Sequence, residues 1–363
     1  MTSEFLPVGL LPDIARNLDI STGQAGLLMT IPGLVAAGAA PLSIAFAGHI
    51  DRRRVLLALL IALGVSNVLA ATATSLAVIL IGRFLLGLAV GAFWTIAGSL
   101  GPRLRPGPEG VKANAVILSG ISFGTVAGIP AGAVIGDMFD WRMAFWAGGL
   151  LALVAVAAVA TLLPSLPATN RRGIRGMPAL LRRPRARIGL IAVLTIFLAH
   201  FAAYTFVTPF LNERSGIAGP LLSSLLLANG IAGFAGNALG GWISSKKVNL
   251  SVIVASALLG GSALLLLWLG EYQAAAAAAV VVWGLSFGMV PIAMQSFLQS
   301  AAKDAIEDMQ AMFVMVGQIA IGMGALAGGV IVDGAGLGGA MLFGGLAALS
   351  TILLMLAPSA RSR

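Results

Sequence analysis

The chain has 363 residues, of which 59% are hydrophobic and 10% are charged, and its formal net charge is +9. A soluble domain carries about 25% charged residues, so this composition excludes a water-soluble globular fold. The absence of cysteine excludes disulfides, thiolate nucleophiles and thiolate metal sites. Two histidines without an HExxH motif predict no histidine metal site, and no cofactor is expected.

Twelve largely apolar segments follow one another along the chain. A helix needs about 20 such residues to cross a bilayer. Segments of this kind lie at 1–15, 22–47, 55–73, 77–100, 113–136, 142–163, 188–211, 219–243, 250–269, 272–300, 309–332 and 338–357. The sequence therefore predicts an all-α membrane protein with twelve transmembrane helices. The first segment is shorter than a full span and holds Glu4 and two prolines, so we expect a truncated first helix, with an upstream extension or a different start in the natural protein.

The positive charges gather on one side of the predicted spans. With the N-terminal side inside, 18 of the 22 Lys and Arg residues lie inside, Arg16, Arg142 and Arg214 lie outside, and Arg83 falls within a span. This asymmetry predicts that both termini face the cytoplasm. The net charge is therefore a topology signal, and no nucleic-acid partner is expected. Segment 164–187 carries seven arginines and no acid; it is interpreted as a cytoplasmic linker or, alternatively, as a contact with anionic lipid.

One unit of nearly half the chain length occurs twice in the same direction. The stretches 48–55, 87–91, 132–137 and 148–150 return at 241–248, 284–288, 328–333 and 344–346, with offsets of 193, 197, 196 and 196. Parallel repeats in a membrane protein predict two halves that rock around a central site. We expect an N-terminal six-helix half at 1–165, a basic linker at 166–187 and a C-terminal six-helix half at 188–363.

Three ionisable side chains lie inside predicted spans, where a charge is costly and marks a candidate functional site. Glu4 is a simple proton carrier, unless a frayed terminus leaves it solvated. Arg83 shares a helix face with Gly87 and Trp94 and would attract an anion or act on a carboxylate, unless it extends to the interface. His200 would titrate during transport, or would hydrogen-bond between helices as a neutral ring.

Polar and aromatic side chains within the spans are candidates for a substrate cavity. His200, Tyr204 and Thr208 follow an i, i+4, i+8 pattern and predict one polar stripe. Amides beside aromatic rings suit a neutral or amphipathic ligand, although they also serve as contacts between helices. The candidate cavity residues are Phe93, Trp94, Tyr204, Asn229, Asn237, Gln295 and Gln318.

A charged turn between the second and third spans is a candidate gate. It comprises Gly48, Asp51, Arg52, Arg53 and Arg54. Asp51 is placed to cap the third span and to pair with an arginine, and such contacts would break when the halves rock. The alternative is that the arginines only anchor the loop on the inner side.

Glycines recur at every fourth position of the fifth span. The ridge contains Gly120, Gly124, Gly128 and Gly132, with Pro130 among them. Small residues allow a neighbouring helix to approach closely, and proline weakens the backbone at one point. The ridge therefore serves tight packing or bending during a transport cycle.

Together these motifs resemble the drug:proton antiporter branch of the major facilitator superfamily over the whole chain. The turn 48–54 is similar to a shortened form of the loop motif Gly-x-x-x-Asp-Arg-x-Gly-Arg-Arg, and 83–87 resembles Arg-x-x-Gln-Gly with Leu86 in place of Gln. The ridge resembles the span 5 antiporter motif, with Ile129-Pro130 replacing Gly-Pro. Stretches 4–11, 80–83, 91–94 and 283–287 are similar to the group of purine ribonucleoside efflux pumps and sugar efflux permeases.

The resemblance implies a monomeric, multi-pass exporter in a bacterial inner membrane, driven by the proton gradient, with Arg83 as the proton-coupling arginine. Its expected partners are a small-molecule substrate, protons and the bilayer, and nucleosides or sugars are the preferred substrates. Open alternatives are efflux of chloramphenicol-like drugs, proton-coupled uptake, and a membrane sensor or scaffold without transport. Ionisable groups at membrane depth argue against a scaffold. The spans carry no catalytic motif that predicts an enzyme.

Overall fold

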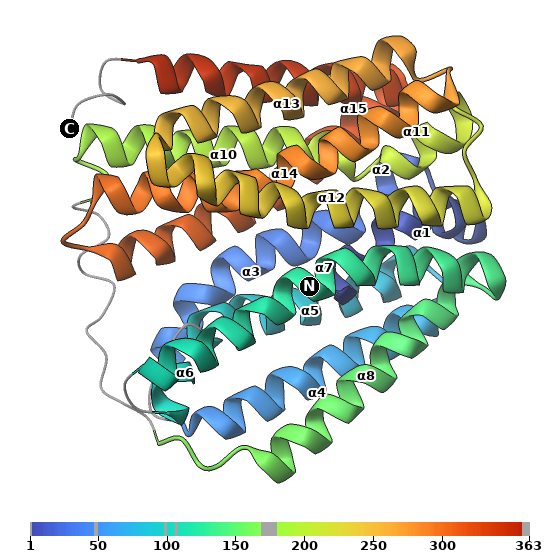
Figure 1. The fold of residues 1–363 in the computed structure, drawn as a ribbon. Coiled ribbons are helices and arrows are strands. Elements are labelled where there is room, and N and C mark those ends of the chain that lie inside the picture. The colour runs from blue at the N-terminus through green and yellow to red at the C-terminus, as the bar shows by residue number, and fades with distance from the viewer. Residues whose placement is uncertain (1, 47–49, 98–99, 106–107, 168–179, 358–363) are drawn as a thin grey trace.

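The computed structural model describes residues 2–46, 50–97, 100–105, 108–167 and 180–357, and these are helical almost throughout (Figure 1). We use "N-terminal half" for residues 1–165 and "C-terminal half" for 188–363. The helices of the N-terminal half are α1 (Thr2–Leu18), α2 (Thr22–Ala25), α3 (Leu27–Phe46), α4 (Arg52–Ala71), α5 (Leu76–Ala97), α6 (Leu100–Leu104), α7 (Pro108–Met138) and α8 (Trp141–Leu162). Those of the C-terminal half are α10 (Pro184–Tyr204), whose first turn lies in the predicted linker, α11 (Val207–Arg214), α12 (Gly219–Lys246), α13 (Val248–Leu269), α14 (Gln273–Ala301) and α15 (Ile306–Leu356).

Nine helical segments in the described ranges are long and apolar enough to cross a membrane. The last of them, α15, contains a break at Gly336, where φ is 76°, so it makes two spans. Together with α1 and α7, which pack against each other, these segments make twelve spans. The predicted fold class, an all-α membrane protein with twelve helices, is therefore confirmed.

The seventh predicted span, 188–211, is divided into two helices. α10 ends at Tyr204, and the Phe206 N–H then bonds to the Ala203 carbonyl at 3.0 Å in a tighter turn. Pro209 has no N–H, and its ring would clash with the Thr205 carbonyl four residues earlier. A continuous helix would lose a hydrogen bond at this point, and the span is divided into α10, with His200 and Tyr204, and α11, with Thr208, so the prediction of one continuous polar stripe was wrong here.

Short polar side chains begin several of the helices. Asp51 Oδ1 accepts a hydrogen bond from the Arg53 N–H at 2.8 Å and caps α4. Ser21 caps α2: its hydroxyl accepts from the Gln24 N–H at 3.0 Å, and the Gln24 side chain accepts from the Ser21 N–H at 3.0 Å. These bonds satisfy N–H groups that have no partner within the first helical turn.

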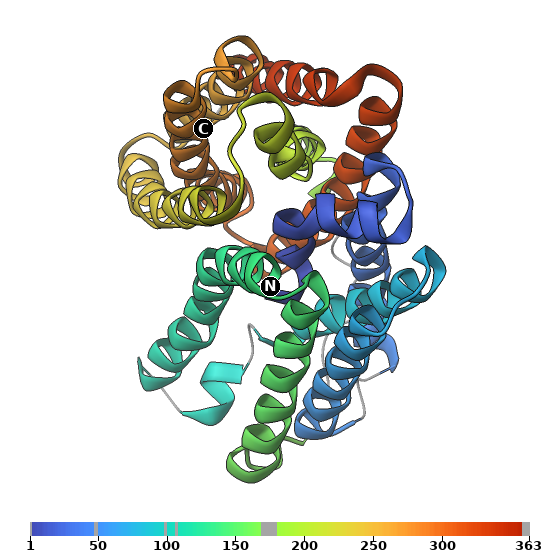
Figure 2. The same ribbon diagram turned by 90° about the vertical axis from the view of Figure 1, so that its right-hand side faces the viewer.

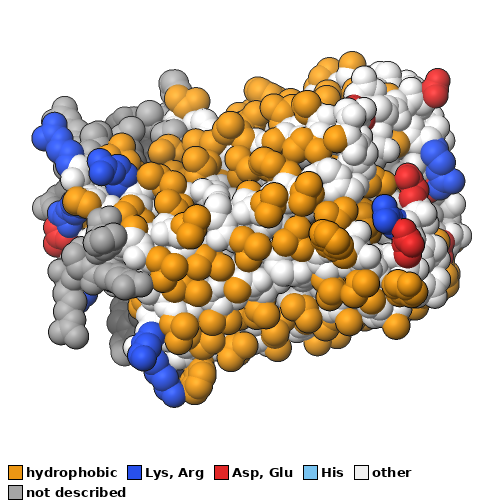
Figure 3. All heavy atoms as spheres, turned by 90° about the horizontal axis from the view of Figure 1, so that it is seen from above, with side chains coloured by type: hydrophobic (Ala, Val, Ile, Leu, Met, Phe, Trp, Pro, Cys, Tyr) orange, Lys and Arg blue, Asp and Glu red, His pale blue; other side chains and the backbone are white. Residues whose placement is uncertain are grey.

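The two halves diverge toward the left-hand end of the molecule in Figure 1 and converge toward the right-hand end, which faces the viewer in Figure 2. We call the end where α4, α10 and α13 begin the linker end, and the end where they finish the far end. Lys and Arg side chains gather at the linker end, and a band of exposed apolar side chains separates it from charges at the far end (Figure 3). This apolar band, with the spans beneath it, is the surface of a multi-pass membrane protein.

Glycines allow the backbones of the two halves to touch. α3 packs on α15, and α7 packs on α12. A Cβ on Gly33 of α3 would lie 2.7 Å from the backbone nitrogen of Gly322 and 3.0 Å from its Cα atom. Such close approach requires glycine at both positions, because backbone atoms cannot move aside as a flexible side chain can.

The glycine ridge of α7 lies partly against α1. A Cβ on Gly128 would lie 2.6 Å from the Thr2 side chain, and one on Gly132 would lie 2.3 Å from that of Leu6. Thr2 also donates its hydroxyl to the Gly124 carbonyl at 3.1 Å. Pro130 is buried between these positions, whereas Gly120 is exposed and has open space around it. The ridge positions α1, and its role in bending stays a prediction.

We expect Gly33→Ala to destabilise the protein by about 1–3 kcal/mol, because the added methyl group overpacks a backbone contact. The matched control is Gly38→Ala in the same helix, where a Cβ would meet nothing within 4 Å. The control should leave stability unchanged or raise it slightly, since alanine favours helix. Thermal unfolding of the detergent-solubilised protein measures both, and equal midpoints for the two variants would contradict the contact.

Candidate functional site

The buried residues Glu4 and Arg83 approach each other from α1 and α5. Each side chain is 1% exposed. Arg83 Nη1 donates a hydrogen bond to the Ser3 carbonyl at 2.6 Å, and its guanidinium carbon lies 5.2 Å from the centre of the Phe145 ring. Both Glu4 carboxylate oxygens, and Arg83 Nε and Nη2, have no hydrogen-bond partner within the described residues. The site therefore holds an acid and a base with unused hydrogen-bonding capacity.

A second polar side chain fixes the first turn of α1. Asn67 of α4 donates its amide to the Ser3 hydroxyl at 3.1 Å and to the Leu63 carbonyl at 2.9 Å. A Cβ on Gly148 of α8 would lie 2.8 Å from Asn67 Oδ1, so the amide is packed between helices. Ser3 is thus held by α4 and α5 together, which fixes the position of the neighbouring Glu4.

Gln318 of α15 brings the C-terminal half to this site. The Gln318 amide and the Arg83 charge both interact electrostatically with the Glu4 carboxyl. The contact between Gln318 and Glu4 does not have the geometry of a hydrogen bond. Gln318 is 5% exposed, and its Oε1 has no partner in the described part of the chain. The candidate site therefore lies between the halves: Glu4 and Arg83 belong to the N-terminal half and Gln318 to the C-terminal half.

The His200 ring belongs to an aromatic network inside the C-terminal half. Its Nδ1 accepts a hydrogen bond from Trp283 Nε1 at 2.9 Å, and it stacks on Phe287 with ring centres 3.5 Å apart. Tyr204 stacks on its other side and donates its hydroxyl to Asn229 Oδ1 at 3.0 Å. Because Nδ1 is an acceptor, a neutral ring carries its proton on Nε2. These contacts match the neutral histidine that the sequence left as one alternative, while a role in proton coupling stays a prediction.

One aromatic pair connects this network to Glu4. Phe5, the residue after Glu4, stacks on Phe201 of α10 with ring centres 5.6 Å apart and an interplanar angle of 15°. Phe201 in turn meets the edges of His200 and Phe287. Phe5 and Phe201 are both buried and lie on opposite halves. A flat aromatic contact therefore crosses between the halves beside the ionisable pair.

The other predicted cavity residues are dispersed. Phe93 packs with Leu56 and Ile96 inside the N-terminal half, and the side chain of Trp94 lies outside the described residues. Gln295 is half-buried and Asn237 is exposed. Helical spacing predicts which residues share a helix face but not how the helix is rotated about its axis, so a role for these residues in a substrate cavity stays a prediction.

The charged turn lies at the linker end of the N-terminal half. Gly48 is outside the described residues, Arg54 is exposed, and the Arg52 N–H donates to the Leu166 carbonyl at 2.9 Å. Asp51 Oδ2 accepts a hydrogen bond from the Ser165 hydroxyl, and that bond lowers the pKa of the Asp51 carboxyl. Arg53 donates to the Ala160 carbonyl. The turn is thus fastened to the end of α8, and its role as a gate stays a prediction.

An ion pair joins two segments at the linker end of the C-terminal half. Arg183 makes two parallel bonds to Asp304, of 2.6 and 2.7 Å. The hydrogen bond from Arg183 lowers the pKa of Asp304 to about 2. The pair stays ionised near neutral pH and ties the start of α10 to the turn before α15.

The sequence interpretation missed Ser3, Phe5, Asn67 and Phe145 at this site. Asn67 was detectable, because it is a lone amide within an apolar span. Ser3 binds Arg83 through its backbone carbonyl, which any residue carries, and the two phenylalanines look like ordinary core residues in any sequence pattern. Nothing in the pattern could have identified those three.

Comparisons with known proteins agree on one family. Residues 1–325 match the model of the Major Facilitator Superfamily. The chain is 34% identical over 354 residues to the purine ribonucleoside efflux pump NepI of Shigella sonnei and to that of Escherichia coli, covering 98% of this chain and 89% of the relative.

Solved structures share the fold. The nucleoside transporter NupG has a TM-score of 0.79 at 15% identity, with 98% of this chain and 97% of that chain covered. A bacterial homologue of the human lysosomal transporter Spinster, in an inward-facing and occupied conformation, has a TM-score of 0.73 at 14% identity, with 99% and 92% covered. At these identities the likeness concerns the fold alone.

We expect Trp283→Phe to destabilise the protein by about 1–3 kcal/mol, because it leaves the buried His200 Nδ1 without a donor. Trp268→Phe is the matched control, since Trp268 is 77% exposed on α13. Thermal unfolding should show a lower midpoint for the first variant only. A midpoint for Trp283→Phe equal to that of the parent would contradict the hydrogen bond.

Proposed function

Because the chain belongs to the major facilitator superfamily, we propose that it exports small organic solutes in exchange for protons, with purine nucleosides as preferred substrates. Like its relatives, the chain is a membrane transporter and not an enzyme. The observation that carries the proposal is that Glu4 and Arg83 are buried with unused polar atoms, and that Glu4 lies beside Gln318 of the other half. The 34% identical relatives, named as purine ribonucleoside efflux pumps, support the substrate class.

In this proposal Glu4 carries the proton. The ionised carboxylate balances the Arg83 charge, so the pair is tolerated at membrane depth. A proton on Glu4 removes that balance, and it also occupies a carboxylate oxygen to which a substrate hydroxyl or amino group would otherwise donate a hydrogen bond. Protons and substrate would thus compete for one site, as exchange requires.

Gln318 can serve both charge states of Glu4. Its amide N–H groups can donate to the ionised carboxylate, and its Oε1, unpartnered among the described residues, can accept from the protonated one. Gln318 stands on α15 while Glu4 stands on α1. A change of protonation would therefore alter a contact between the halves, which is the motion that alternating access needs.

The aromatic pair beside Glu4 supports a flat substrate. Phe5 and Phe201 stack on each other across the contact between the halves, and their ring faces would become free when the halves part. A purine base stacks on such rings, and stacking of a base on an aromatic ring contributes about 1–3 kcal/mol. The nucleoside hydroxyls would bond to the unused groups of Arg83 and Gln318. A sugar has no aromatic ring to use this surface.

The charge distribution supports an orientation in a bacterial inner membrane. With the linker end in the cytoplasm, the basic side chains obey the positive-inside rule and both termini are cytoplasmic. The halves would then be closed toward the outside and open toward the cytoplasm. The proposed unit is a monomer powered by the proton gradient without a cofactor.

Proteoliposomes with an imposed pH gradient and radiolabelled inosine test the proposal. Antiport fills vesicles whose lumen is more acidic than the medium, whereas symport fills those whose lumen is more alkaline. We expect inosine to enter acidic vesicles, and we expect Glu4→Gln and Arg83→Ala to reduce this movement to the level of empty liposomes. Glu109→Gln is the control, because Glu109 lies in an exposed ion pair with Lys112.

Several results would contradict parts of the proposal. Gradient-driven transport retained in Glu4→Gln would refute the coupling site. Entry of inosine into vesicles with an alkaline lumen would show symport and would contradict the proposed export. Movement of arabinose or chloramphenicol in place of inosine would reassign the substrate, and movement of none of them would favour a sensor or scaffold.

A further inference from the structure

The far end is closed by a carboxylate of one half bonded to a helix start of the other. Asp333 of α15 accepts a hydrogen bond from the Ser21 hydroxyl at 2.7 Å through Oδ2, and from the Gly23 N–H at 2.9 Å through Oδ1. Both donors stand at the start of α2, and Ser21 is held there by its capping bonds to Gln24. We call these three residues, Ser21, Gly23 and Asp333, the outer clasp.

The backbone at Gly23 packs directly against the residues around Asp333. A Cβ on Gly23 would lie 2.4 Å from Asp333 Oδ2 and 2.4 Å from the Gly329 carbonyl oxygen. A Cβ on Gly329 would in turn lie 2.8 Å from the Gly23 carbonyl oxygen. The start of α2 and the end of the first span of α15 therefore touch backbone to backbone where the carboxylate is bonded.

The internal repeat supplies the matching position in the other half. Asp137 precedes Asp333 by 196 residues in the repeated stretch, and it stands near the far end of α7. It faces the start of α12: a Cβ on Gly219 would lie 3.6 Å from Asp137 Oδ1. Each carboxylate thus stands opposite the first turn of the second span of the other half.

The turns before these helix starts correspond residue by residue. Asp19 and Gly216, 197 residues apart, both have positive φ, of 52° and 63°. With the same offset, Ser21 corresponds to Ala218 and Gly23 to Pro220. Alanine has no hydroxyl and proline has no N–H, so the second copy has lost both donors of the outer clasp. Asp137 has no hydrogen bond or ion pair within the described ranges.

We propose that Asp333 is a positioning residue for transport, which holds the far end closed through a clasp that the fold carries on one side only. The inference rests on the proposed alternating-access function. The outer clasp joins the halves where they must part to open outward, so its two bonds stabilise the conformation open at the linker end. The matching contact between Asp137 and the start of α12 has no such bonds, so it can separate easily. The closed state is therefore stabilised by one clasp and not by two.

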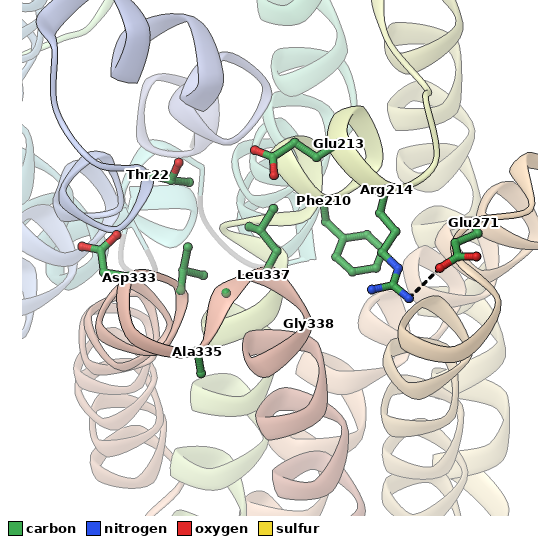
Figure 4. A pocket seen from close by; sticks show the side chains of 11 residues that line it. Thr22, Phe210, Glu213, Arg214, Glu271, Asp333, Ala335, Leu337 and Gly338 are labelled. Atoms are coloured by element: carbon green, nitrogen blue, oxygen red, sulfur yellow. Dashed lines mark hydrogen bonds and ion pairs between the residues drawn. The ribbon is translucent and has the colours of Figure 1, made fainter.

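The surroundings of Asp333 allow the outer clasp to open without disturbing the membrane core. A basin of about 930 Å³ lies beside it, lined by Thr22 next to the clasp and by residues of α11, α15 and the turn before α14 (Figure 4). In that basin Arg214 is paired with Glu271 at 2.8 Å within the C-terminal half. Arg214 is thereby engaged away from Asp333, whose two bonds run to Ser21 and Gly23.

Distance measurements between spin labels test the outer clasp without any substrate. The chain has no cysteine, so Thr74→Cys and Ala274→Cys place one label on each half at exposed far-end positions. In labelled protein in lipid nanodiscs, Asp333→Ala should raise the ratio of long to short far-end distances by on the order of tenfold. Asp137→Ala, the symmetry-matched control, should leave the distribution as in the parent.

A gain of function provides the converse test. Ala218→Ser combined with Pro220→Gly restores both donors opposite Asp137, and it should shift the distribution toward short distances and slow transport. An unchanged distribution in Asp333→Ala would overturn the proposal, and so would equal shifts in Asp333→Ala and Asp137→Ala, since loss of charge alone would then explain them. A protein that moves no inosine but responds to Asp333→Ala would contradict the proposed function and leave the outer clasp standing.

Discussion

The arrangement of this protein depends on the burial of one acid and one base at membrane depth. Among the described residues, Arg83 has one hydrogen bond, to the Ser3 carbonyl, and Glu4 has none. A buried pair of this kind is stable only while both charges are present, and breaking it by removing one partner is strongly unfavourable. The first turn of α1 is therefore where a change of one proton has the largest effect on the contact between the halves.

Two kinds of contact surround that pair, and they differ in how easily they can part. Glycine contacts such as Gly33 with Gly322 bring backbones together over apolar surface. The Phe5–Phe201 stack and the outer clasp are single side-chain contacts between the same halves. Helices in lipid gain little from burying apolar surface against each other, so a few polar and aromatic contacts can decide which end is open.

Hydropathy and the internal repeat predicted the twelve-helix fold, because a bilayer imposes helix length and the repeat imposes topology. They failed at α10 and α11, where Pro209 breaks a span that is apolar on both sides. The ionisable candidates Glu4 and Arg83 were predicted from the cost of burying charge, and the structure places them together. Ser3 and Phe5 were not, because a backbone acceptor and a core-like ring leave no trace in composition. The outer clasp could be identified only from the repeat and the structure together, because Ala218 and Pro220 in the second copy lack the hydroxyl and the N–H that bond to Asp333 in the first.

The central claim is that substrate and proton compete at the buried Glu4. Calorimetric titration of the purified protein with inosine, in buffers of the same pH but different protonation enthalpy, measures the protons exchanged on binding. The account predicts that inosine binding releases a proton in the parent and that Glu4→Gln binds inosine without proton release. Equal binding enthalpies of the parent in all buffers, with inosine bound, would contradict it.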